Sequence, residues 1–199
     1  MKTTLVFCAD RPITSGMCSP VGHSMLGIAV GLFYLRKLQG LSRSAGIGLL
    51  AGFVFLANAP DLDYVPGLLS GELNRYHHLV THSICWGGLF SLGCWLIWRG
   101  LTVTAGRREL GFVLMAVLSH LAADLVTQDG AAPYGILLFW PMHVEYLQAP
   151  FWIFGMTAKN DLRMLLQWSN LWVALRELVT TAPLVMGAVW FTWRAHRSP

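Results

Sequence analysis

The sequence has 199 residues, of which 55% are hydrophobic and only 12% are charged, whereas about 25% of the residues in an ordinary soluble domain are charged. The net charge is +4, but the basic residues form no stripe along one predicted surface, which argues against a nucleic-acid-binding protein. We therefore expect a single membrane-embedded domain over residues 1–199. Residues 1–16 are expected to be a non-native or disordered extension, with Met17 as an alternative start.

Five apolar segments are predicted to be transmembrane helices. In chain order they cover residues 21–38, 45–59, 83–98, 110–127 and 171–193. These segments are apolar on all sides, whereas the helices of a soluble all-α domain would carry a polar stripe at the helical period. Segments shorter than about 20 residues need a locally thinner bilayer or an end that is buried in protein. The predicted fold class is all-α, a polytopic membrane protein with about five transmembrane helices.

The basic residues mark the loops on one side of the membrane. They follow the first, third and fifth predicted helices, at Arg36, Lys37, Arg43, Arg99, Arg107, Arg108, Arg194 and Arg197. By the positive-inside rule this side is the cytoplasm. The N-terminus and the loops after the second and fourth helices are therefore expected on the non-cytoplasmic side.

Residues 128–170 hold Pro133, Pro141 and Pro150 among many aromatic residues. Proline interrupts a straight helix and aromatic residues gather at membrane interfaces, so we expect an interfacial or re-entrant outer loop. Such a loop would cap a site on the outer face, and the alternative is an aromatic belt without chemistry. In the fifth helix, Arg176 and Glu177 either pair with groups on other helices or indicate that the helix begins near Leu178.

Histidine and aspartate gather at four helix ends that the predicted topology places on the outer side. They are His23 at the start of the first helix, Asp61 and Asp63 after the second, His77, His78 and His82 before the third, and His120 and Asp124 at the end of the fourth. Taken singly, each could cap a helix or lie in a loop. The topology was drawn from lysine and arginine alone, so their convergence is an independent result. Ionisable groups at membrane depth are costly and are usually paired or functional.

Spacing and chemistry favour a metal site over a purely structural polar network. His120 and Asp124 are four residues apart and therefore neighbours on one helix face. His78 and His82 share that spacing if the third helix has already begun there. Imidazole and carboxylate groups together suit zinc, manganese or iron, and the carboxylates offset the charge of a dication. We predict a divalent metal, with zinc first and manganese or iron as alternatives.

The order of these motifs resembles a known family. The matching elements are Gly22-His23-Ser24, Pro60-Asp61-Leu62-Asp63, residues 77–83, and Ser119-His120 through Asp124 with Thr127 and Gly130. The sequence is similar to the bacterial YdjM-type (DUF457) integral membrane proteins, described as metal-dependent hydrolases, although His77-His78 stands where that family often has His-Arg. The resemblance implies a multi-span inner-membrane hydrolase whose ligands are His23, Asp61, Asp63, His77, His82, His120 and Asp124.

A more distant likeness concerns the order of the ligands. It is similar to that of zinc-dependent phospholipase C, which implies hydrolysis of a phosphoester or a lipid-linked substrate by a metal-activated water, with a second metal on the phosphoryl oxygens. In that interpretation the catalytic residues are Asp61, His77 and His120, while Arg75 and His78 bind the substrate. Ser83 and Ser119 would orient the ligands from behind. Arg75 has an equal alternative as an interfacial residue that contacts lipid headgroups.

Other functional classes remain open on the sequence. A membrane zinc protease is disfavoured because the sequence has no His-Glu-x-x-His motif. A metal-ion transporter is the stronger alternative, and a non-catalytic membrane protein with a structural metal is another. The ligands gather toward one face of the membrane, which favours an enzyme. We leave His143, on the outer loop with Glu145, and His196, in the basic tail, out of the ligand set. The expected partners are membrane lipid and a lipid or phosphodiester substrate.

Overall fold

The structure is a computed structural model that describes residues 18–38, 40–71, 74–102, 105–130, 133–158 and 167–195, so the predicted extension at 1–16 lies outside the described residues. Over that part the chain forms helices and loops without a β-strand, which confirms the all-α class. The long helices are α1 (Pro20–Leu35), α2 (Arg43–Asn58), α4 (Ile84–Leu101), α5 (Arg107–Leu125) and α6 (Trp168–Ala195). Three short helices join them, namely η1 (Ala59–Asp63), α3 (Tyr64–Ser70) and η2 (Val80–His82).

Among the described residues, three helical stretches are long and apolar enough to cross a membrane: Arg43–Ser70, Ile84–Leu101 and Trp168–Arg194, with Pro20–Leu35 as a shorter apolar helix. The first of these runs from α2 through η1 into α3, so the second predicted span continues past its expected end at residue 59. The chain is thus a helical membrane protein. That α1 and α5 also cross the bilayer stays a prediction, as does the place of the loop at 133–158.

Small residues let α1 approach α2 closely. A Cβ added at Gly27 would lie 2.7 Å from the backbone oxygen of Phe53, and one at Gly31 would lie 2.9 Å from a methyl group of Leu50. Two small residues four positions apart are a common device for packing membrane helices backbone to backbone. Because α1 contacts α2, α5 and α6, it forms the middle of the bundle.

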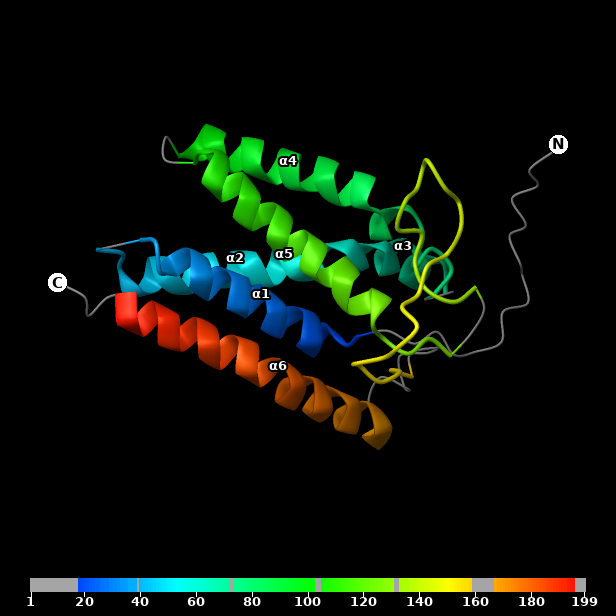
Figure 1. Cartoon of the computed structure of the whole chain (residues 1–199). Helices are drawn as coiled ribbons and strands as arrows, with labels where there is room; N and C mark the ends of the chain where they lie inside the picture. Colours follow the sequence, from blue (N-terminus) through cyan, green and yellow to red (C-terminus); the bar gives the residue numbers. More distant parts are fainter. Residues whose placement is uncertain are drawn as a thin grey trace.

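One end of the bundle collects the helix termini that carry the histidines and aspartates. The starts of α1, α4 and α6 lie there together with the ends of α2 and α5, and α3 and the loop at 133–158 lie beside them (Figure 1). The links between α1 and α2 and between α4 and α5 lie at the opposite end. This arrangement agrees with the alternation that the loop charges predicted, although it does not assign either end to a compartment.

Candidate metal centre

Five different elements bring the seven predicted ligands together. His23 comes from the first turn of α1, Asp61 and Asp63 from η1, His77 from the turn before η2, His82 from the end of η2, and His120 and Asp124 from the last turns of α5. Almost all of these side chains are buried, and the rings of His23, His82 and His120 have no exposed surface. Residues far apart in the sequence thus form one buried polar cluster at one end of the bundle.

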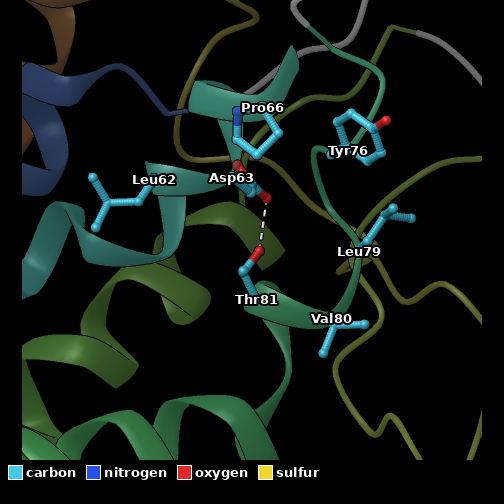
Figure 2. A pocket seen from close by; sticks show the side chains of 7 residues that line it. All are labelled: Leu62, Asp63, Pro66, Tyr76, Leu79, Val80 and Thr81. Atoms are coloured by element: carbon cyan, nitrogen blue, oxygen red, sulfur yellow. Dashed lines mark hydrogen bonds between the residues drawn. The ribbon is translucent and has the colours of Figure 1, made fainter. Parts of the chain in front are cut away.

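Asp63 organises one side of the cluster. Its Oδ2 accepts a 2.6 Å hydrogen bond from the Thr81 hydroxyl (Figure 2), and its Oδ1 lies 2.8 Å from Nδ1 of His77. Nδ1 of His82 lies 3.3 Å from Oδ2 of Asp63 and 3.1 Å from the hydroxyl of Thr81. Because the Thr81 proton goes to Asp63, its oxygen can accept the N–H of His82. Asp63 therefore fits a positioning role for His77 and His82.

The opposite side is organised by the backbone. Nδ1 of His120 lies 2.7 Å from the carbonyl oxygen of Ala57, which lies in the last turn of α2. A carbonyl oxygen can only accept, so Nδ1 of His120 must carry the hydrogen. The hydrogen bond at one ring nitrogen decides which nitrogen is left for a metal, and here it leaves Nε2.

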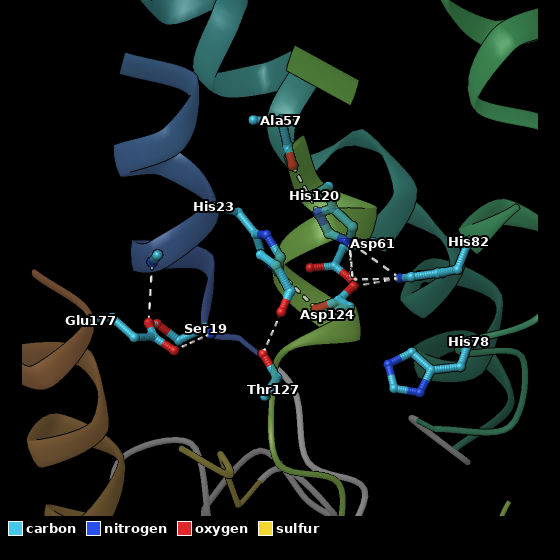
Figure 3. Close-up of polar contacts among 12 residues, drawn as sticks. Ser19, His23, Ala57, Asp61, His78, His82, His120, Asp124, Thr127 and Glu177 are labelled. Atoms are coloured by element: carbon cyan, nitrogen blue, oxygen red, sulfur yellow. Dashed lines mark hydrogen bonds and ion pairs between the residues drawn. The ribbon is translucent and has the colours of Figure 1, made fainter. Parts of the chain in front are cut away.

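Four ligand atoms then face one point (Figure 3). Nε2 of His82 and Nε2 of His120 are 3.2 Å apart. Oδ2 of Asp124 lies 3.1 Å from Nε2 of His120 and 3.4 Å from Nε2 of His82. Oδ1 of Asp61 lies 3.5 Å from the same nitrogen of His120 and 3.6 Å from that of His82. Because the Nδ1 atoms of His82 and His120 both carry hydrogen, their Nε2 atoms face each other with lone pairs. Two lone pairs at this distance repel each other unless a proton or a metal cation lies between them.

His23 extends this set on the side of α1. Its ring stacks on that of His120 with the centroids 3.7 Å apart, and its Nε2 lies 3.4 Å from Oδ1 of Asp124. Within the described part of the chain, neither ring nitrogen of His23 makes a hydrogen bond, and the buried Oδ1 of Asp61 and both oxygens of Asp124 have none either. Buried polar atoms normally have a partner. These orphaned atoms converge, so the residues fit a divalent cation.

Charge gives a second indication. Burial lowers the pKa of His82, but its close contacts with the carboxylates of Asp124, Asp61 and Asp63 outweigh burial and raise the pKa well above its usual value. The three carboxylates thus favour a positive charge at this position. A buried group of carboxylates needs such compensation, and a metal ion supplies it as well as a proton does.

Other groups of potential ligands overlap this centre. His77, His78 and His82 form one, and Asp61, Asp63 and His77 form another. His77 stacks on the ring of Tyr64 with the centroids 4.1 Å apart, and its Nδ1 lies 3.9 Å from Oδ1 of Asp61. His77 therefore lies beside the four-atom centre and shares Asp61 with it.

His78 and His82 do not share a helix face, because α4 begins only at Ile84. Instead His78 has a left-handed backbone with φ of 63°, a conformation that is uncommon outside glycine. It turns a buried ring toward the cluster, with its centroid 5.1 Å from that of His82. Nδ1 of His78 lies 3.9 Å from Oδ2 of Asp129. The expected proximity of the two histidines is present, but a turn produces it.

Three further residues of the predicted site lie outside the centre. Ser83 donates to the backbone oxygen of Val80 and accepts from the backbone nitrogen of Trp86, so it caps α4. Ser119 donates to the backbone oxygen of Ala116. The hydrogen bonds of both serines go to the backbone and not to a ligand side chain. The groups that orient the ligands are the Thr81 hydroxyl, beside His82, and the Ala57 carbonyl, beside His120. Arg75 is exposed, with its guanidinium 5.6 Å from the centre of the Tyr76 ring.

A buried carboxylate on α6 fixes the start of α1. Glu177 accepts hydrogen bonds from the backbone nitrogens of Ser19, at 2.7 Å, and Gly22, at 3.1 Å, and from the Ser19 hydroxyl. Of the two expectations for Glu177, pairing with a group on another helix is the one that the structure has. A carboxylate at a helix N-terminus satisfies orphan N–H groups and complements the helix dipole. It also anchors the turn that carries His23.

Sequence reasoning missed four contributors to the site. Thr81 lies within the histidine motif at residues 77–83, and Asp129 follows the fourth predicted helix, so the sequence carries a signal for both. The Ala57 carbonyl carries no signal, because every residue has a backbone oxygen. For Glu177 the sequence indicated pairing with another helix as one of two alternatives, but not that its partner is the start of α1. His143 and Glu145 are exposed on the loop, whereas His196 lies outside the described residues.

Fold and centre together define a helical membrane protein with a buried cluster of histidine and aspartate that could hold a metal ion. The comparison with protein families agrees: the chain belongs to the YdjM inner membrane protein family, whose model matches residues 17–196. No curated protein and no solved structure matches the sequence. Family membership thus supports the membrane assignment, while the likeness to phospholipase C has no support from these comparisons.

Proposed function

We propose that the chain is a metal-dependent hydrolase of the membrane that acts on a phosphoester or a lipid-linked substrate. The observation that carries this proposal is the pair of Nε2 atoms of His82 and His120, 3.2 Å apart. Each ring gives its Nδ1–H to an oxygen outside the centre, so both lone pairs are left to face the carboxylates of Asp61 and Asp124.

In this proposal His82, His120, Asp61 and Asp124 hold the ion, with His23 as a further ligand. Such nitrogen-rich sets with carboxylates favour zinc, while manganese or iron can also be held. The bound ion would supply Lewis acidity to the scissile ester and lower the pKa of a water to about 7. The ligand set is kept in place from behind by the Ala57 carbonyl, Asp63 and Thr81.

His77 is the residue that we assign to proton transfer. Its Nδ1–H is held by Asp63 at 2.8 Å, which leaves Nε2 as the basic nitrogen. A carboxylate that fixes the tautomer of a histidine in this way is common in general acid–base catalysis. Asp61, 3.9 Å from the same ring, links His77 to the ion.

The test combines metal analysis with turnover in reconstituted vesicles. Purified protein should contain at least one tightly bound transition metal, and a His120→Ala, Asp124→Ala double variant should lose it. His77→Ala should abolish hydrolysis of a panel of lipid phosphodiesters while it retains metal. His143→Ala, on the exposed loop, is the control and should behave like the wild type.

Two results would contradict the proposal. One is a folded protein that neither contains metal after gentle purification nor takes it up on titration. The other is metal flux across the vesicle membrane that His120→Ala blocks, with no hydrolysis of any ester. Flux alone would indicate a transporter, because intramembrane histidine and aspartate also mark ion pathways. Bound metal with neither flux nor turnover would indicate a structural site.

A further inference from the structure

We propose that the groove beside Asp63 binds one acyl chain of a membrane phospholipid, so that the phosphoester of that lipid lies at the metal centre. This inference rests on the proposed function and deepens it, because it names the class of substrate and the surface that selects it. The metal centre alone would accept a soluble phosphoester as readily as a lipid.

The groove is a shallow apolar depression of about 490 Å³ between η1 with α3 on one wall and the turn with η2 on the other. This volume falls within the range of about 300–1,000 Å³ that small-molecule sites have. Its walls are mostly aliphatic or aromatic and come from Leu62, Asp63, Pro66, Tyr76, Leu79, Val80 and Thr81 (Figure 2). Such a surface fits a hydrocarbon chain and offers a polar ligand few partners.

The polar end of the groove is shared with the metal centre. Asp63 and Thr81 line the groove and bond to each other at 2.6 Å. The same Asp63 accepts from His77, which lies 3.9 Å from Asp61. A lipid whose chain occupies the groove would therefore have its polar head one side chain away from the ligands. Arg75 lies with its guanidinium 5.6 Å from the ring centre of the groove residue Tyr76, which puts an exposed cation beside the groove.

The groove is continuous with the surface that meets the bilayer. Leu62 and Pro66 belong to the apolar stretch Arg43–Ser70, which is long enough to cross a membrane. On that stretch Leu62 is 48% exposed, Val65 50% and Leu69 83%. Exposed apolar side chains on a stretch that is long and apolar enough to cross a membrane mark a surface that meets lipid, and from this surface an acyl chain can enter the groove sideways. A lipid is for this reason the occupant to which we commit.

The chain offers a matched control surface. A second shallow crevice, of about 420 Å³, lies on α6 and is lined by Val185, Met186, Val189, Trp190 and Trp193. It is similar in size and equally apolar, but its lining includes no carboxylate and no hydroxyl. Lipid that merely coats the protein should mark both surfaces alike, whereas a substrate site should be marked selectively.

The experiment uses the full chain in vesicles of phosphatidylethanolamine and phosphatidylglycerol that contain a trace of phospholipid with a photoactivatable acyl chain. After irradiation, adducts are mapped by mass spectrometry. Adducts on Tyr76, Leu79 and Val80 should exceed those on the α6 crevice. Leu62→Trp and Val80→Trp, which fill the groove from opposite walls, should each reduce groove adducts by about tenfold. That reduction corresponds to about 1.4 kcal/mol, which is the contribution of about two displaced CH₂ groups of the acyl chain.

Val189→Trp, the control in the α6 crevice, should leave the groove adducts unchanged, and thermal unfolding shows that each variant is folded. Equal labelling of both surfaces overturns the proposal, and so do groove adducts that neither filling variant reduces. Leu79→Cys chains that join in pairs through a thiol crosslinker, with the groove unlabelled, would identify an interface between copies and also overturn it. Selective groove adducts on a protein that binds no metal would instead support the lipid groove and contradict the proposed metal-dependent hydrolase.

Discussion

His82 and His120 differ from ordinary buried histidines in where their N–H groups point. A buried imidazole in a structural network usually uses both nitrogens on protein partners. Here Nδ1 of His82 faces Thr81 and Asp63, and Nδ1 of His120 faces the Ala57 carbonyl. The Nε2 atom of each ring faces Asp61 and Asp124. The metal hypothesis therefore depends on the residues behind the ligands as much as on the ligands.

Thr81 and Ser83 provide a test of that dependence at two positions in one short segment. Thr81→Val keeps the shape but removes the hydroxyl that bonds Asp63 and lies 3.1 Å from Nδ1 of His82. We expect metal affinity to fall by about 10- to 100-fold, as is typical when the support of a ligand is lost. Competition with a fluorescent zinc chelator measures this affinity.

Ser83→Ala is the matched control, because Ser83 caps α4 and contacts no ligand side chain. It should lower the free energy of unfolding by about 0.5–2 kcal/mol, seen as a lower melting temperature, with metal affinity nearly unchanged. If Ser83→Ala weakens metal binding as much as Thr81→Val does, the orienting role belongs to the segment as a whole. The distinction drawn between the two hydroxyls would then be incorrect.

The residue types of the centre could be predicted from the sequence more fully than their roles. The four-residue spacing of His120 and Asp124 was sufficient to place them together, because a helix converts spacing into position. The same argument failed for His78 and His82, since a turn with a left-handed residue replaces the helix there. Both oxygens of Asp63 are hydrogen-bonded to neighbouring side chains, to Thr81 and His77. Such contacts depend on the tertiary structure, so no local sequence pattern predicts them.

At the scale of elements, a long-range contact between α6 and the start of α1 joins the two ends of the chain. Glu177 in the middle of α6 bonds the first turn of α1, 155 residues away at Gly22. A carboxylate within an apolar helix is costly unless it is paired, and here the N–H groups of a helix start provide the pairing. The contact fixes the height of α1 and with it the position of His23.

Glu177→Gln tests this anchor. The amide keeps the shape and one acceptor oxygen, but it loses the charge and places an NH₂ group against the donors of Ser19 or Gly22. We expect destabilisation of about 1.5–3 kcal/mol, the usual range for a hydrogen bond to a charged group. Thermal unfolding in detergent, followed by circular dichroism, measures it.

Arg176→Gln is the control, because Arg176 is the exposed neighbour of the buried Glu177. It should leave the melting temperature nearly unchanged. Equal melting temperatures for Glu177→Gln and the wild type would indicate that the cap contributes nothing to the fold. A loss of metal affinity in Glu177→Gln, out of proportion to its stability, would show in addition that the anchor sets the position of His23.

Helix boundaries could be predicted from the apolar segments to within a few residues. The first predicted segment, 21–38, corresponds to α1 at Pro20–Leu35, and the last, 171–193, to α6 at Trp168–Ala195. The short elements η1 and α3 could not be predicted in this way. Pro60 and Pro66 interrupt the apolar pattern without ending the helical path, so residues that looked like a loop continue the second helix.

At the scale of the whole molecule, the alternation of the helices puts the metal centre and the arginines after α4 at opposite ends. Arg75 lies in the turn between α3 and η2, directly before His77 and His78. Arg107 is the first residue of α5, and that helix begins at the far end of the bundle from α3 (Figure 1). Both side chains are exposed. The loop charges predict that the Arg107 end is cytoplasmic, and the proposed lipid substrate would then be met in the outer leaflet.

Single cysteines test this orientation in a background where the native cysteines are replaced by alanine. Arg75→Cys should react with a membrane-impermeant thiol reagent in intact cells, whereas Arg107→Cys should react only after the membrane is made permeable. Both should label fully in detergent, which controls for accessibility. The reverse pattern would place the centre in the cytoplasm and move the substrate to the inner leaflet. Labelling of both positions in intact cells would contradict the alternation itself, because the two residues would then share a side.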